Sequence, residues 1–256
     1  MKLESNDYSV NVVKESPRRA SRPLIGTATW LALLLCAALQ SPGTALAQSG
    51  LVAAYSFNEG AGTTAGDSSG NGLNGTIANA TWVATGKYGK ALSFNGTNAL
   101  VTVADPGPLM LTTGMTLEAW VNPSTVSSAW RDVIYKGNDN YYLEGTSTNG
   151  GAPAAGGTFG GANANAYATG PLPTNTWSHL ALTYDGSALR LYVNGVLASS
   201  IARTGDIQTS ANPLQIGGDS LYGQYFQGMI DEVRVYDVAL SAAQIQSDMN
   251  TAIGGQ

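Results

Sequence analysis

Four oxygen-bearing side chains have the types that a calcium ion prefers: Asp67, Asn71, Glu59 and Asp231. Calcium takes six to eight oxygen ligands in loose geometry. Asp231 shares the strand alternation of Val233 and Val235, so its carboxylate faces the core if these valines do. A buried carboxylate is costly unless it is paired or bound to metal. We therefore predict a structural Ca²⁺ site at Asp67, Asn71 and Asp231, with Glu59 as a weaker ligand.

Two alternatives to this metal site follow from the same residues. The segment Asp67-Ser68-Ser69-Gly70 also has the composition of a turn, in which an aspartate caps backbone N–H groups. A β-bulge near Asp231 would turn its carboxylate away from the core. Either arrangement would give these side chains a role without metal.

A second set of residues has the chemistry of a glycan site, because aromatic faces stack on sugar rings while amides and carboxylates bind hydroxyl groups. The predicted ligand-binding residues are Trp130, Asn138, Asp139, Tyr141, Tyr142, Tyr222 and Tyr225. Trp130 has small and polar neighbours, which favours a loop position where a large aromatic ring meets a partner. The alternative is ordinary packing, since tyrosine is common on sheets.

The sequence does not predict a catalytic site. Glycosidases need two carboxyl groups on one face, but Asp231 and Glu232 are adjacent and so point to opposite faces of a regular strand. Glu118 has Trp120, not an acid, two positions away. His179 is the only histidine, and we interpret it as structural. We therefore expect a protein that is not an enzyme.

The elements that must position these residues are short strands. Residues 177–200 read as three strands joined by Asp185-Gly186 and Asn194-Gly195, dipeptides typical of hairpin turns. Similar alternation predicts strands at 51–57, 75–77, 81–84, 91–94, 100–103, 115–121, 132–136, 141–144, 213–217 and 226–236. Residues 150–170, rich in Gly, Ala and Asn, are expected to form a loop with one poor strand. One helix is predicted at 241–250, with Ser241 as N-cap and Gln244 completing a capping box.

The first 47 residues have the features of a secretory signal peptide: a basic flank, an apolar run over 24–39 and the small-x-small sequence Ala45-Leu46-Ala47. We expect cleavage before Gln48, a secreted (extracellular or periplasmic) protein, and a single domain over 48–256. That domain contains no cysteine and carries seven basic against fourteen acidic residues. The acidic balance argues against a nucleic-acid partner, and no further apolar run is long enough to span a membrane.

Six segments in order together resemble the laminin-G-like jelly-roll domains of the concanavalin A-like lectin/glucanase superfamily: 51–60, 67–72, 91–96, 115–121, 177–195, and 228–236 with 239–241. The resemblance implies an all-β fold, a two-sheet antiparallel jelly-roll sandwich, here with one short C-terminal helix. It implies that the first and last strands lie near each other, which would bring the Asp67 loop to Asp231, and that calcium is commonly bound. The departure from the family pattern is at 150–170.

The resemblance implies binding of carbohydrate or protein more often than catalysis, since this fold hosts many functions. We expect an exported, non-catalytic, lectin-like module that binds a carbohydrate or glycoconjugate and is stabilised by calcium. One alternative is a protein-interaction or cell-surface adhesion module of the same fold. Another is a glycoside hydrolase or polysaccharide lyase.

Overall fold

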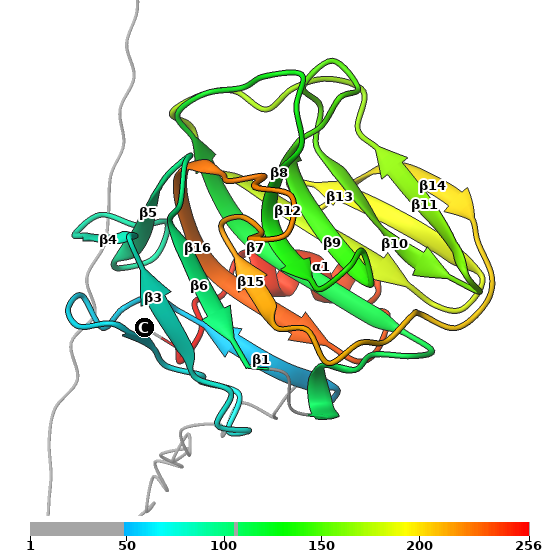
Figure 1. Ribbon diagram of the computed structural model, residues 1–256, viewed down its shortest axis with the longest axis horizontal. Helices are drawn as coiled ribbons and strands as arrows, with labels where there is room; N and C mark the ends of the chain where they lie inside the picture. The colour runs from blue at the N-terminus through cyan, green and yellow to red at the C-terminus, as the bar shows by residue number, and fades with distance from the viewer. Residues whose placement is uncertain (1–48, 105–106, 256) are drawn as a thin grey trace, which may run out of the picture. The chain divides into compact units, whose positions relative to one another are not determined.

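The computed structural model describes residues 49–104 and 107–255; the predicted signal peptide lies outside them. Two antiparallel sheets face each other around one apolar core (Figure 1). Sheet A has the order β14 (Val196–Ala202), β13 (Ala188–Val193), β12 (Ser178–Tyr184), β7 (Met115–Pro123), β16 (Gln227–Tyr236), β5 (Ala91–Asn95), β4 (Thr81–Val83), with β1 (Leu51–Tyr55) also paired to β16. Sheet B has the order β11 (Ala162–Tyr167), β10 (Ala154–Phe159), β9 (Tyr141–Thr146), β8 (Arg131–Lys136), β15 (Leu214–Ile216), β6 (Leu100–Val103), β3 (Gly75–Ala78), β2 (Thr64–Ala65). The predicted all-β sandwich is confirmed.

Alternating side chains place the core between the sheets. In β7, Leu117, Ala119 and Val121 belong to the core, while Glu118 and Trp120 point to the outer face of sheet A. The hairpin turns have the predicted chemistry, because Gly186, Asn194 and Gly195 all adopt positive φ angles, which these residue types tolerate. A short 3₁₀ helix (Gly107–Leu109) lies between β6 and β7.

A β-bulge in β16 corrects the predicted orientation of Asp231. The pairing of β16 with β7 shifts between Asp231 and Arg234, and Glu232 within the bulge has a φ of 53°. Ile230 and Val233 therefore both contact the core, while Asp231 lies opposite Trp120 on the outer face of sheet A. The extra residue breaks the period of two on which the prediction depended.

Residues 150–170 form a regular hairpin, so the prediction of a loop with one poor strand was wrong. Strands β10 and β11 pair in unbroken register from Ala154↔Tyr167 to Phe159↔Ala162. Strand β10 is also paired with β9. Its small residues gave a weak strand signal, but a Cβ atom on Gly156 or Gly157 would clash with the neighbouring strands.

The C-terminal helix α1 (Ala242–Met249) covers the outer face of sheet A. Its Ile245 packs with Ala181, Tyr192 and Tyr236 of that face. The predicted capping box is present: the Ser241 side chain accepts from the Gln244 backbone N–H, and the Gln244 side chain accepts from the Ser241 N–H. None of the helices in the described residues is long and apolar enough to cross a membrane.

Candidate functional site

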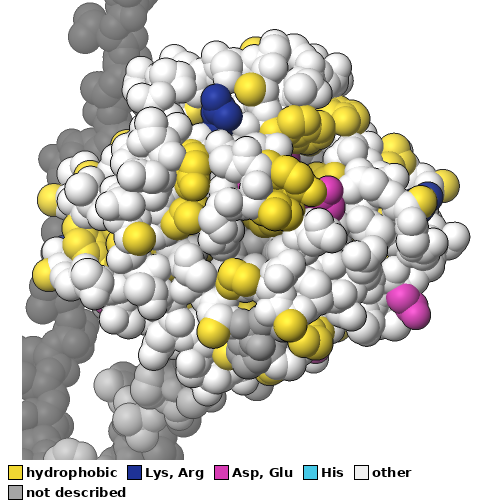
Figure 2. All heavy atoms as spheres, viewed as in Figure 1, with side chains coloured by type: hydrophobic (Ala, Val, Ile, Leu, Met, Phe, Trp, Pro, Cys, Tyr) yellow, Lys and Arg dark blue, Asp and Glu magenta, His cyan; other side chains and the backbone are white. Residues whose placement is uncertain are grey.

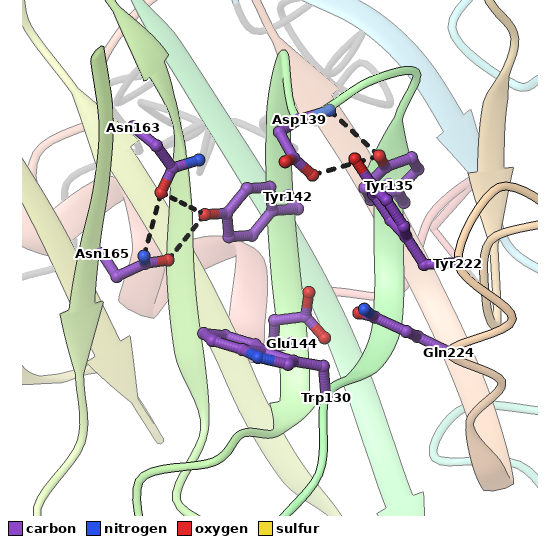
Figure 3. A pocket seen from close by; sticks show the side chains of 9 residues that line it. All are labelled: Trp130, Tyr135, Asp139, Tyr142, Glu144, Asn163, Asn165, Tyr222 and Gln224. Carbon is purple, nitrogen blue, oxygen red and sulfur yellow. Dashed lines mark hydrogen bonds between the residues drawn. The ribbon is translucent and has the colours of Figure 1, made fainter.

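A pocket of about 230 Å³ opens on the outer face of sheet B, bounded by strands β8–β11 and the loop between β15 and β16. Its lining combines aromatic rings, amides and carboxyl groups: Trp130, Tyr135, Tyr142, Tyr222, Asn163, Asn165, Gln224, Asp139 and Glu144 (Figure 3). Figure 2 shows hydrophobic side chains gathered over the middle of this face. A few polar groups that converge on a space between aromatic side chains are typical of a ligand site.

Strand register brings the lining residues together. Leu143 belongs to the core, so Tyr142 and Glu144 on either side of it point outward. Tyr142 lies opposite Tyr135 of β8 on one side and opposite Gly156 of β10 on the other. Neighbouring strands thus present one continuous outer surface.

The aromatic rings form a rigid cluster. Tyr135 and Tyr142 stack with their centroids 6.4 Å apart and an interplanar angle of 20°. Trp130 meets the edge of Tyr142 at 6.4 Å, and Tyr222 meets Tyr135 edge-on at 6.3 Å. Stacked and edge-on contacts are the arrangements that aromatic pairs prefer, so the rings support one another's positions.

Hydrogen bonds hold the tyrosine hydroxyl groups at two ends of the pocket (Figure 3). The Tyr142 hydroxyl donates to Oδ1 of Asn165 at 2.6 Å and lies 3.0 Å from Oδ1 of Asn163. The Tyr135 hydroxyl donates to Oδ1 of Asp139 at 3.1 Å and accepts from the Asp139 backbone N–H at 3.0 Å. Each ring is therefore anchored by its polar end.

Gly156 leaves the space that Tyr142 occupies. A Cβ atom on Gly156 would lie 2.6 Å from Cε2 of the Tyr142 ring and 2.6 Å from Oδ1 of Asn165. These distances are far inside van der Waals contact. The absence of a side chain in the middle of β10 is therefore required for the pocket to have its depth.

The loop that carries Tyr222 and Gln224 is held by an aspartate. The Asp219 carboxylate accepts hydrogen bonds from the backbone N–H groups of Tyr222 and Gln224. Oε1 of Gln215 accepts from the Ser220 N–H at 2.9 Å. The side chain of Tyr222 is 52% exposed, and this loop holds it over the pocket despite that exposure.

Buried acids lie at the floor of the pocket. Glu144 is paired across the strands with Asp132, which is fully buried. Burial raises the pKa of Glu144 to about 7. Burial, together with the neighbouring Glu144 and Asp219, raises the pKa of Asp132 well above its usual range. No hydrogen-bond donor among the described residues reaches either oxygen of Asp132, which fits a protonated carboxyl group facing its acidic neighbours.

The structure brings together four of the seven predicted ligand-binding residues: Trp130, Asp139, Tyr142 and Tyr222. Asn138 lines a neighbouring hollow, also reached by Tyr135, and Tyr225 lines neither of the two. The structure does not place Tyr141 at the site as predicted: its ring lies in the core, and its hydroxyl donates to the Leu109 carbonyl oxygen.

Five lining residues lie outside the predicted set: Tyr135, Glu144, Asn163, Asn165 and Gln224. Asn163 and Asn165 alternate with alanines in the hairpin that was expected to be a loop. Reading Ala162 to Tyr167 as a strand would have placed both asparagines on one face.

The residues predicted to bind calcium have other contacts. The Asp67 carboxylate accepts from the Ala54, Ser69 and Leu73 N–H groups and from the Ser69 hydroxyl, all at 2.8–3.0 Å. The Asn71 amide donates to the Val52 carbonyl oxygen. These are the contacts of a turn, and hydrogen-bond donors already occupy both oxygens of Asp67.

The other two predicted ligands are engaged elsewhere. The Glu59 carboxylate accepts from the Gly66 N–H at 2.6 Å, and Asp231 accepts from the N–H groups of Tyr88 and Glu232. Within residues 49–104 and 107–255, no three His, Cys, Asp or Glu side chains are grouped so as to hold a metal ion. The four residues as placed do not fit one calcium ion.

Two stacked antiparallel sheets with an aromatic pocket on one outer face define a β-sandwich domain. The chain belongs to the concanavalin A-like lectin/glucanases superfamily, whose family model matches residues 95–246.

Among solved structures, the chain is similar to domain 4 of AbnA, a GH43 extracellular arabinanase from Geobacillus stearothermophilus, in complex with arabinotriose. The likeness has a TM-score of 0.65 and 26% identity, covering 78% of this chain and 98% of that one. The binding domain of Paraclostridial Mosquitocidal Protein 1 (TM-score 0.65, 16% identity, covering 80% and 52%) shares the fold. So does the botulinum neurotoxin serotype G binding domain (TM-score 0.60, 14% identity, covering 78% and 50%).

Among curated proteins, the chain matches pappalysin-1 of Mus musculus and of Homo sapiens, each with 38% identity over 80 residues. The match covers 29% of this chain and only 5% of either relative. It concerns one segment of much larger proteins.

Proposed function

We propose that this protein is a non-catalytic, lectin-like module that binds carbohydrate in the pocket on the outer face of sheet B. The observation that carries the proposal is the fixed cluster of Trp130, Tyr135, Tyr142 and Tyr222 beside amide and carboxyl groups. Ring faces stack on the C–H faces of a sugar, and the polar groups bind its hydroxyls. The small volume suits a short stretch of a glycan.

The comparison with AbnA supports the ligand class. That protein's domain 4 is described in complex with arabinotriose, and it resembles this chain over nearly its whole length. The toxin domains are less than 25% identical, so their likeness concerns the fold alone. An arabinan is therefore a reasonable first neutral polysaccharide to test.

We include export in the same proposal, because an exported module would bind polysaccharides that lie outside the cell. The features of residues 1–47 support cleavage before Gln48. Sequencing the N-terminus of the protein recovered from the medium or periplasm tests this directly, and a mature form that retains residues 24–39 would contradict it.

A binding panel tests the function. Purified protein spanning residues 48–256 is incubated with insoluble and soluble polysaccharides, including arabinan, and binding is followed by sedimentation and calorimetry. We expect saturable binding to at least one of them. Trp130→Ala should weaken it by about tenfold or more, because stacking on the ring is lost. Val196→Ala, at an exposed apolar residue outside the pocket, is the matched control.

Two results would contradict the proposal. Absence of binding across the panel would favour a protein partner instead. Release of new reducing ends or unsaturated sugars during incubation, lost in Glu144→Gln, would instead show a hydrolase or a lyase.

A further inference from the structure

Glu144 is a buried acid among the residues that line the ligand pocket. Its side chain is 2% exposed, and it lies between Trp130 and Gln224 (Figure 3). The side chain of Asp132 contacts it from within the sheet and favours its ionised form. A carboxylate surrounded by so little water attracts a cation more strongly than an exposed carboxylate does.

The groups around Glu144 are acidic. Asp132 faces it from β8, Asp219 from the β15–β16 loop and Asp139 from the turn between β8 and β9. The backbone N–H of Arg131 favours the ionised form of Glu144. Its guanidinium is directed to the Trp130 carbonyl oxygen, to which Nη1 donates at 3.0 Å.

Neither lysine nor arginine is among the residues that line the pocket. An anionic sugar would therefore bring its charge against buried acids with no cation to balance it, which disfavours binding. A positively charged group on a ligand would instead be attracted by these acids. The whole chain has a formal net charge of −5, which adds to this preference at longer range.

The aromatic walls also suit a cation. An ammonium group within about 6 Å of a ring centroid is attracted by the negative face of that ring. Trp130, Tyr135, Tyr142 and Tyr222 supply four rings around the carboxyl groups. No three His, Cys, Asp or Glu side chains within residues 49–104 and 107–255 are grouped so as to hold a metal ion. An organic ammonium needs only one or two acceptors.

We propose that the pocket selects amino sugars that carry a free ammonium group, namely glucosamine units of an unacetylated polymer, over N-acetylated and acidic sugars. The inference rests on the proposed carbohydrate-binding function and adds a charge preference to it. The ammonium group would pair with Glu144, while the sugar ring stacks on the aromatic cluster.

The protonation of Glu144 gives this preference a pH signature. Burial raises the pKa of Glu144 to about 7, so a bound ammonium would shift the carboxyl group towards its ionised form and release a proton. The amine of a glucosamine unit itself titrates near neutral pH, so the preference for it should be greatest where Glu144 is ionised and the amine is still protonated, and should fall at lower and at higher pH. A neutral sugar should show no such dependence.

Calorimetry with oligosaccharides of matched length tests the proposal: pentamers of glucosamine, N-acetylglucosamine and galacturonic acid, and an arabinan oligomer, at pH 6 and pH 7. We expect the glucosamine pentamer to bind about tenfold tighter than its acetylated form and the galacturonic acid pentamer not to bind. Glu144→Gln should bring the first two within about twofold of each other. Asp206→Asn removes an exposed acid outside the pocket and should change nothing.

The outcomes separate this inference from the function beneath it. Equal or tighter binding of the neutral oligomers would overturn the charge preference and leave carbohydrate binding intact. Binding of none of the oligomers and of no polysaccharide in the panel would overturn both. Equal weakening by Asp206→Asn and Glu144→Gln would reduce the effect to overall charge and so overturn the assignment to this pocket. The preference in the unsubstituted protein decides the matter even if Glu144→Gln does not fold.

Discussion

The outer faces of the two sheets each carry a tryptophan, tyrosines and buried acids, but only one of them is covered by the chain itself. On sheet A, Trp120 is 6% exposed: Lys87 Nζ lies 3.8 Å from the ring centroid, and the indole N–H donates to the Met249 carbonyl oxygen. On sheet B, Trp130 is half-buried beside an open pocket. The segment that follows β16 occupies the first face and leaves the second free.

The charges on the two faces differ in the same way. Under the C-terminal segment, Arg234 donates to Glu232 and to the Thr251 carbonyl oxygen. Burial and the neighbouring Asp248 raise the pKa of Glu118 well above its usual range, and the charge of Arg234 offsets part of that rise. Beneath the pocket of sheet B, the side-chain interactions of Asp132 and Glu144 are with other acids. The acids of the covered face thus have a guanidinium group of the chain beside them, and those at the open face have acidic side chains. The difference teaches that similar residues can be structural on one face and available to a ligand on the other.

Replacing each tryptophan by alanine is the most direct way to break this comparison. Trp120→Ala should lower the free energy of unfolding by about 3–5 kcal/mol, because a buried ring and its contacts are lost. Trp130→Ala should lower it by less than about 1 kcal/mol while weakening glycan binding. Urea unfolding of both variants gives the two values. A large loss of stability in Trp130→Ala, with binding retained by the folded fraction, would mark Trp130 as core.

Stability against pH should separate Glu144 of sheet B from His179 of sheet A by sign. Burial raises the pKa of Glu144 to about 7 from a usual value of 4.5, so this group destabilises the folded state as pH rises from about 4.5 to 7, on the order of 3 kcal/mol in total. Burial lowers the pKa of His179 to about 3 from 6.5. Its contribution is present above pH 6.5 and is lost as pH falls towards 3.

The measurement is urea unfolding of the unsubstituted protein, Glu144→Gln and His179→Gln between pH 4.5 and 8. Relative to the unsubstituted protein, Glu144→Gln should gain stability as pH rises and His179→Gln as pH falls. Two differences that change in the same direction would refute the assignment of opposite pKa shifts to Glu144 and His179.

The Asp67 turn supports β1 of sheet A and tests whether calcium is needed there. Asp67→Ala should cost about 2 kcal/mol with calcium or with chelator, because several backbone N–H groups lose their acceptor. Melting curves in both conditions measure this. The original calcium hypothesis makes a different prediction: calcium raises the melting temperature of the unsubstituted protein, and the variant does not respond.

The smallest expected loss of stability concerns helix α1, which covers the outer face of sheet A. Ser241→Ala removes the acceptor for the Gln244 N–H at the start of α1 and should cost about 1 kcal/mol. Ser247→Ala, within the same helix, is the matched control. Thermal unfolding should show a lower midpoint only for Ser241→Ala; an equal shift in both would indicate that helix propensity, not the cap, was changed.

Much of the fold was predictable because β-strand alternation is local. Leu117, Ala119 and Val121 could be assigned to the core from their spacing alone, and Asn194-Gly195 marked its hairpin. The bulge at Asp231 was not predictable from alternation, because one inserted residue reverses the faces and leaves no compositional trace. Strand β10 was missed because glycine and alanine have low strand propensity and gain their stability here from neighbouring strands.

The site was only partly predictable for a related reason. Trp130, Asp139 and Tyr142 are close in sequence, so their association could be inferred from one segment. Glu144 joins Asp132 and Asp219 only through strand register and a distant loop, and pairing between segments more than 70 residues apart is not encoded in any local pattern.

Gly156 gives this arrangement an evolutionary and practical consequence. A single methyl group on that residue would lie about 2.6 Å from Tyr142, from Asn165 and from the backbone oxygen of Ala164, so the two lining side chains or strand β11 would have to move. The shape of the binding surface thus depends on one backbone position beneath it. Relatives with alanine or serine there would be expected to have a rearranged site, and the specificity of the domain is constrained by a residue that contacts no ligand itself.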